Sequence, residues 1–198
     1  MSEVTGTATA AETTPAAIGP LLERVTVVDH IDPVPGYQRS CKKGQACVFG
    51  EAWHDPLSHS GCDVRNRLLA KSLHNVVFKP NTHDCKVIAG QLNPDPYTGT
   101  AVDLHQVAVD HIVPLHAAWN AGASHWDLQR RRAFANDMTE LIAVSSTQNS
   151  RKSDSTLAEW LPPVSKCDYV IRYLTVTAKY QLPITVKDRA AAVAACAA

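Results

Sequence analysis

The sequence predicts a single α+β domain, and three observations support this fold class. Its 198 residues are enough for one domain with a substantial buried core. Strand-like apolar runs come mainly in the first part of the chain, and stretches with apolar residues at helical spacing come mainly after them. Six cysteines, an even number, predict a domain stapled by disulfides.

The N-terminal part reads as a tail and a linker. Residues 1 to about 20 are rich in Thr, Ala and Pro and have little to pack, so we expect them to be flexible. The stretch LLERVTVVD is compatible with a short strand, and HIDPVPGY after it is rich in turn-forming residues. We therefore predict a flexible tail and linker over residues 1–36 and a folded domain over 37–198.

The first elements of the folded domain are a helix, a hairpin and a strand. VRNRLLAKSLHNV predicts a helix from its apolar residues at helical spacing, which are Val64, Leu68, Leu69, Leu73 and Val76. CKVIAGQL and TAVDL predict two strands of a hairpin joined through NPDPYTG. QVAVDHIV predicts a further short strand, which Pro114 ends.

Helices dominate the second half of the chain. LHAAWNAGA predicts a helix with Gly122 near its end, and WDLQRRRAFAND predicts another. SSTQNSRKSDS favours a polar helix or a turn. DYVIRYLTVTAKYQL predicts a long amphipathic helix, and VKDRAAAVAACAA predicts a last one.

Composition excludes some classes of function. The charges balance at 19 basic and 19 acidic residues, so no strong overall field attracts nucleic acid, and any polyanion must be met by a local patch. No run of eighteen apolar residues exists, so we expect no membrane partner. No feature indicates an obligate protein partner, and we expect a monomer.

The cysteines indicate an oxidising compartment. Because no CxxC pair occurs, disulfides are favoured over a zinc site or free thiols, and we predict a secreted protein. The opening residues have no basic region followed by an apolar run, so they do not read as a signal peptide. Because we predict secretion, we expect a signal peptide that is not present in this chain. Fifteen pairings are possible, and local proximity suggests Cys41 with Cys47.

Two hexamers are near copies, VDHIDP at residues 28–33 and VDHIVP at 109–114. Turn-forming residues follow the first, and no polar constellation lies downstream of it. The second is followed by FAND, ELIAV and QNSRKSD, which supply Asn136, Glu140, Asn149 and Lys152. We therefore assign chemistry to Asp110 and His111, and interpret Asp29 and His30 as a coincidence.

These residue types suit phosphodiester hydrolysis, which needs a deprotonated water and a cation that offsets charge on the phosphate and the leaving 3′ oxygen. His111 can accept a proton from water near neutral pH. The oxygens of Asp110 and Asn149 are hard ligands that suit Mg²⁺ or Mn²⁺. Lys152, one helical turn beyond Asn149, can hold a phosphate or form a salt bridge with an acidic neighbour.

The ordered motifs VDHIVPL, AND, ELIAV, QNSRKSD and WLPP resemble the HNH endonuclease superfamily, and most closely its secreted bacterial branch related to the C-terminal domain of GmrSD-type restriction enzymes. Upstream, GYQRSC, CVFGEAW, GCDVRNRLL, CKVIAG and DPYTG resemble the front half of those nucleases. The likeness covers about residues 37–196. It implies a ββα-metal finger inside a disulfide-stapled domain with several helices and a small antiparallel sheet.

The resemblance also implies roles for residues. Asp110 and Asn149 hold the metal, His111 is the general base, and Arg65 contacts phosphate. Because neighbouring side chains of a strand face opposite sides, the resemblance implies a bend or loop near Asp110 and His111. The remaining disulfides are then Cys62 with Cys85 and Cys167 with Cys196.

One position departs from the family pattern, because Glu140 stands where many HNH proteins have their middle Asn. Either Asn136 takes that role or the role is dispensable in this branch, and Glu140 is also able to act as an acceptor in the second coordination sphere. Both residues are therefore candidates for the catalytic site.

These observations predict a secreted, Mg²⁺-dependent endonuclease that cuts DNA with little sequence specificity and leave RNA open as a substrate. Two alternatives remain. One is a nuclease toxin with a cognate inhibitor. The other is a catalytically inactive, disulfide-stapled nucleic-acid-binding module, which the departure at Glu140 keeps open.

Overall fold

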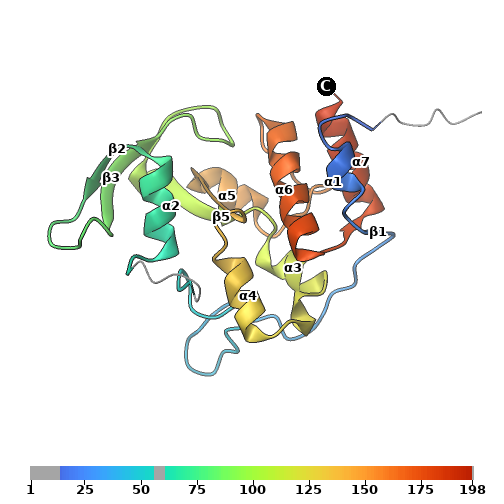
Figure 1. The fold of residues 1–198 in the computed structure, drawn as a ribbon, viewed down its shortest axis with the longest axis horizontal. Coiled ribbons are helices and arrows are strands. Elements are labelled where there is room, and N and C mark those ends of the chain that lie inside the picture. Colours follow the sequence, from blue (N-terminus) through green and yellow to red (C-terminus); the bar gives the residue numbers. More distant parts are fainter. Residues whose placement is uncertain (1–13, 56–60, 198) are drawn as a thin grey trace, which may run out of the picture.

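An antiparallel pair of strands followed by a helix forms the centre of the molecule (Figure 1). A computed structural model describes residues 14–55 and 61–197. In it, β5 (Val107–His111) pairs with β6 (Leu141–Ser145), and α5 (Ser146–Lys152) follows directly. The predicted α+β class is confirmed, and the strands and the helix come in the predicted order.

Both faces of this strand pair are buried. Alternate residues of β6 face two apolar clusters, with Ile142 and Val144 in the larger and Leu141 and Ala143 in the smaller. Every residue of β6 is buried as a result. The strand pair is therefore a rigid support for the residues at its end.

A helix and a three-stranded antiparallel sheet lie on one side of the strand pair. They comprise α2 (Val64–Ser72), β2 (His74–Phe78), β3 (Val87–Leu92) and β4 (Val102–Asp103), and β3 and β4 form the predicted hairpin. The predicted helix was wrong over its last residues, because α2 ends at Ser72 and Leu73 is extended. The β-branched and aromatic residues that follow pair with β3 instead.

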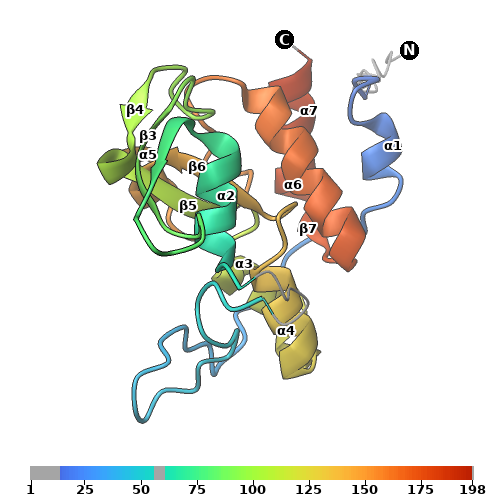
Figure 2. The same cartoon turned by 60° about the vertical axis from the view of Figure 1, so that its left-hand side comes forward.

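Helices cover the other side (Figures 1 and 2). Here α6 (Lys166–Tyr180) packs beside α7 (Val186–Cys196) and α1 (Gly19–Leu22), while α3 (Leu115–Asn120) and α4 (Leu128–Ala135) lie below the strand pair in Figure 1. Two 3₁₀ turns cover Leu104–Gln106 and Ala123–His125. The helices predicted in the second half of the chain are confirmed, and the SSTQNSRKSDS segment forms a helix.

Part of the segment predicted as tail and linker, residues 1–36, packs against the domain. The side chains of Ile18, Leu22 and Val25 are buried in the larger cluster, and β1 (Val27–Val28) pairs in parallel with β7 (Ile184–Thr185). These few apolar residues are outnumbered by Thr, Ala and Pro in the sequence, but long-range contacts with α6 and β7 bury them. Residues 18–28 therefore make domain contacts, whereas residues 1–13 of the predicted tail lie outside the described residues.

The three predicted disulfides are confirmed. Cys41 pairs with Cys47, Cys62 with Cys85, and Cys167 with Cys196. The last bridge joins the start of α6 to the end of α7. Within the described ranges, no helix has the length and apolar character needed to cross a membrane.

Candidate active site

A pocket of about 360 Å³ opens where β5 ends beside α5. Three residues with predicted roles line it together, Asp110 and His111 from β5 and Asn149 from α5. The other polar residues in its wall are Tyr37, Arg39, His116, Ser153 and Asp154. The structure therefore brings together the predicted base and both predicted metal ligands.

His111 is held in one orientation at the edge of the pocket. Its Nε2 lies 2.9 Å from the backbone oxygen of Ala135, and its ring lies nearly parallel to that of Trp53, with 6.0 Å between centroids. A carbonyl oxygen can only accept, so Nε2 carries the proton and Nδ1 has the lone pair. Burial lowers the pKa of His111 to about 4, and His111 is therefore neutral near pH 7. Its Nδ1 is available to accept a proton.

Asp110 lies in a buried hydrogen-bonding network. It is only 5% exposed, and its two carboxylate oxygens accept from Lys152 Nζ at 3.0 Å and from the Tyr97 hydroxyl at 2.6 Å. Burial raises the pKa of Asp110, and the charge of Lys152 opposes that rise. Both donors stabilise the ionised carboxylate and fix its orientation.

Lys152 forms the salt bridge that was one of its two predicted roles. Its side chain is 0% exposed, and Nζ also donates to the backbone oxygen of His111 at 2.8 Å. The residue lies one turn beyond Asn149, but α5 packs against β5, so this position faces the strand. Lys152 therefore positions Asp110 and His111 and does not reach a phosphate at the surface.

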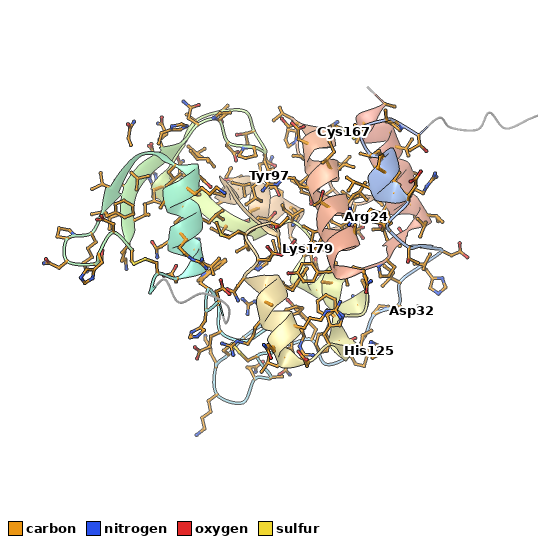
Figure 3. All side chains as sticks on the ribbon, viewed as in Figure 1. Arg24, Asp32, Tyr97, His125, Cys167 and Lys179 are labelled. Atoms are coloured by element: carbon orange, nitrogen blue, oxygen red, sulfur yellow. A yellow bond between two sulfur atoms is a disulfide. The ribbon has the colours of Figure 1, made fainter. Side chains whose placement is uncertain are left out.

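The DPYTG motif explains how Tyr97 reaches the site. Asp95 is fully buried and accepts hydrogen bonds from the backbone nitrogens of Ser145 and Thr98, at 2.9 and 3.1 Å. These bonds fix the β3–β4 loop to the junction of β6 and α5, and Figure 3 labels Tyr97 near the centre of the molecule. Sequence reasoning missed both residues. A tyrosine inside a turn motif was the available signal, because a buried hydroxyl needs a polar partner.

The donor set suits a hard divalent cation. Asp110 and Asn149 offer oxygens to the same pocket, and each Asp110 oxygen retains a lone pair beyond its present bond. The Asn149 side chain makes no hydrogen bond within the described residues, so its oxygen is available for coordination. The same residues contain no cluster of three or more His, Cys, Asp or Glu side chains arranged for a metal. The arrangement fits a cation that keeps several of its waters, as Mg²⁺ does.

The strand does not bend between Asp110 and His111. Both residues pair with β6, Asp110 with Ile142 and His111 with Leu141, and the chain bends at the next two residues. Strand alternation therefore sends Asp110 toward the α5 side and His111 toward Ala135. Both still line the pocket because they lie at the end of β5.

Glu140 lies away from the pocket. It is 0% exposed, its Oε2 accepts from the backbone nitrogen of Val113 at 3.2 Å, and its backbone oxygen accepts from Ile112 at 2.9 Å. Burial raises the pKa of Glu140 well above its usual range, which favours the protonated side chain. Its contacts hold the segment that follows His111.

Asn136 also lies outside the pocket, next to a residue that contacts His111. Its side-chain nitrogen donates to the backbone oxygen of Arg132 at 2.8 Å at the C-terminal end of α4. Asn136 directly follows Ala135, whose oxygen orients His111. The geometry gives Asn136 a positioning role, and neither Asn136 nor Glu140 lines the pocket.

Three further arginines, Arg65, Arg130 and Arg131, lie outside the pocket or are engaged in packing contacts. Arg65 is half-buried on α2 and is not part of the pocket. Arg130 lies 4.3 Å over the ring of Trp126, and Arg131 donates to the backbone oxygens of Val48 and Trp126. These contacts attach α4 to its neighbours.

Comparisons with known proteins place the chain among nuclease-related sequences. Residues 63–193 match the family model of the GmrSD restriction endonucleases, C-terminal domain. A protein of the fungus Arthroderma benhamiae, described as an uncharacterized secreted protein, is 33% identical over 135 residues, covering 66% of this chain and 64% of the relative. The chain thus spans less than two thirds of that relative's length. The fungal source does not confirm the predicted bacterial branch. No solved structure matches the chain.

Proposed function

We propose, because the chain belongs to the family of GmrSD restriction endonuclease C-terminal domains, that it is a metal-dependent endonuclease of the HNH type that hydrolyses phosphodiester bonds of DNA. One observation carries this proposal. A histidine whose Nε2 is held by a backbone oxygen lines the same pocket as two residues with oxygen donors, Asp110 and Asn149. Few functions other than hydrolysis of a charged substrate use this combination.

In the proposed reaction each side chain of the site has a separate role. His111 takes a proton from the attacking water at Nδ1, and its Nε2–H stays bound to Ala135, which keeps the ring in place. Asp110 and Asn149 would hold a divalent cation, which when bound offsets negative charge on the phosphate and the leaving 3′ oxygen. Lys152 and Tyr97 keep the Asp110 carboxylate ionised and oriented.

We expect little sequence specificity and an extracellular location. The pocket residues include an imidazole, oxygen donors and the guanidinium of Arg39, and contacts to phosphate carry no sequence information. The balanced charge predicts weak binding that falls as salt rises. Three disulfides and a relative described as secreted support an oxidising compartment.

Plasmid nicking tests this function. The oxidised protein is incubated with supercoiled plasmid and Mg²⁺ or Mn²⁺, with and without EDTA, beside a His111→Ala variant. We expect nicking that EDTA abolishes and that the variant lacks. Nicking by His111→Ala at the wild-type rate would contradict the assignment of the base. Absence of nicking with either metal, together with retained DNA binding, would favour the inactive binding module.

A further inference from the structure

Arg39 is a cation at the candidate site with no acidic partner. It lies between β1 and α2, lines the same pocket as His111 and Asn149, and is half-buried. Its Nη1 donates to the backbone oxygen of Gly50 at 2.9 Å. This bond uses one of the five N–H groups of the guanidinium and leaves most of its donors available.

The other ionisable groups at or beside the pocket have side-chain partners. Lys152 pairs with Asp110, and His116 Nδ1 lies 2.9 Å from Asp154 Oδ2. Across residues 14–55 and 61–197, no carboxylate lies within ion-pair distance of Arg39. Burial lowers the pKa of Arg39, since its partly desolvated charge has no anion beside it. A bound anion would therefore be stabilised there.

We infer that Arg39 binds the phosphate that is cleaved beside His111, an inference that rests on the proposed nuclease function. A guanidinium can donate two parallel hydrogen bonds to the non-bridging oxygens of a phosphate, which fixes both its place and its orientation. Arg39 and His111 both line the pocket where Asp110 and Asn149 lie. The phosphate would thus lie against the base and the oxygen donors of the same pocket.

The loop that carries Arg39 is preorganised for this role. The Cys41–Cys47 disulfide closes the segment between Arg39 and Gly50, and Val48 donates a backbone hydrogen bond to Gln38 at 3.0 Å. Gly50 has a φ of +73°, and a Cβ added there would approach the Arg132 side chain within 2.5 Å. Glycine is therefore favoured where the loop passes α4, and the constrained loop lowers the cost of ordering Arg39 on binding.

Steady-state cleavage of a short labelled DNA duplex tests the inference. Wild type is compared with Arg39→Ala, Arg39→Lys and a control, Arg24→Ala, which removes an exposed charge beside α1 (Figure 3). We expect kcat/KM to fall about 10- to 100-fold in Arg39→Ala, as for loss of a charge-assisted hydrogen bond. Arg39→Lys should lie between the two, because lysine supplies the charge without the planar fork. Arg24→Ala should match wild type.

Salt dependence separates phosphate binding from a purely structural role. Duplex binding is measured in the inactive His111→Ala background with and without Arg39→Ala, over a series of salt concentrations. Loss of one phosphate contact should reduce the slope of log Kd against log salt by about 1. If Arg39→Ala does not fold by circular dichroism, Arg39→Gln, which keeps a donor for Gly50, replaces it.

The outcomes distinguish this inference from the proposed function. A wild-type enzyme that cuts, with Arg39→Ala as active as Arg24→Ala, overturns the role of Arg39 and leaves the nuclease intact. An unchanged salt slope with reduced activity also overturns it. A wild-type protein that never cuts overturns the nuclease itself.

Discussion

The two near-identical hexamers have opposite surroundings. VDHIDP and VDHIVP differ at one position, where Asp32 corresponds to Val113. The His30 side chain is 76% exposed, and it lies 3.5 Å from the carboxylate of Asp32, which is 84% exposed. His111 instead lies between Ala135 and Trp53, and Val113 is buried. The comparison shows that a histidine becomes a candidate base through its partners.

The positions at which β1 and β5 end explain why the two Asp-His pairs have different surroundings. β1 ends at Val28, before the first Asp-His pair, whereas β5 continues through His111 and pairs with β6. The second pair therefore lies within a strand that is buried on both faces. Its partners Tyr97, Ala135 and Lys152 come from three other parts of the chain.

The largest expected effect is the loss of the base. Changing His111 to Ala should lower the first-order rate of plasmid nicking about 10²- to 10⁴-fold, the usual contribution of a general base. Changing His30 to Ala, the matching residue of the other hexamer, should leave the rate unchanged. A rate lost only in His30→Ala would reverse the assignment of the two hexamers.

The second-largest expected effect concerns the buried ion pair between Lys152 and Asp110, which has no counterpart at the first hexamer. Lys152→Met leaves the Asp110 carboxylate buried without a counter-charge, and the free energy of unfolding should fall by about 3–5 kcal/mol. Urea denaturation measures this change, with the exposed Lys71→Met as control. The double variant with Asp110→Asn should recover part of the loss, and no recovery would show that the pair does not act as a unit.

A smaller effect should follow from Tyr97→Phe, which removes only the hydroxyl that binds Asp110. We expect a loss of about 1–3 kcal/mol in unfolding free energy, together with a higher Mg²⁺ concentration for half-maximal nicking. Tyr173→Phe is the matched control, because Tyr173 is buried but its hydroxyl makes no hydrogen bond within the described residues. Equal behaviour of the two variants would exclude a positioning role for Tyr97.

The smallest effect concerns Glu140 behind Val113, the position at which the hexamers differ. Because burial raises the pKa of Glu140, the folded protein keeps a proton that the unfolded chain releases above its ordinary pKa of 4.5. Wild-type stability should therefore fall as pH rises from 4.5, and Glu140→Gln removes this contribution. The urea concentration at the midpoint of unfolding is measured for both proteins at pH 5 and pH 8. The midpoint of the Gln variant should rise relative to that of wild type between pH 5 and pH 8. If the two midpoints differ by the same amount at both pH values, Glu140 is ionised in the folded protein.

Much of the fold was predictable because its signals are local. Apolar spacing predicted α6 and α7, turn residues predicted the β3–β4 hairpin, and the three disulfides followed from proximity and family resemblance. The errors came where long-range packing outweighed local preference. Pairing with β3 ended α2 early, and burial against α6 brought Ile18 and Leu22 into the domain.

The candidate site was likewise predicted in part from local motifs and decided in part by long-range packing. Asp110, His111 and Asn149 were predicted as a constellation from the order of their motifs, and the structure places them in one pocket. Arg39 and Tyr97 could not be assigned to it, because only the paths of two loops bring them there. Lys152 was predicted with two possible roles, and its burial selects the salt bridge.

The sequence by itself determined the class of fold and the chemical types available for hydrolysis, because these depend on composition and short-range spacing, while the resemblance to a known family implied two of the three disulfide pairings. Tertiary structure alone decided that His111 has a single tautomer, that Lys152 is buried against Asp110, and that burial raises the pKa of Glu140. Protonation and orientation depend on burial and on hydrogen-bond partners from distant segments. Two hexamers with five residues in common therefore have different chemistry in one chain.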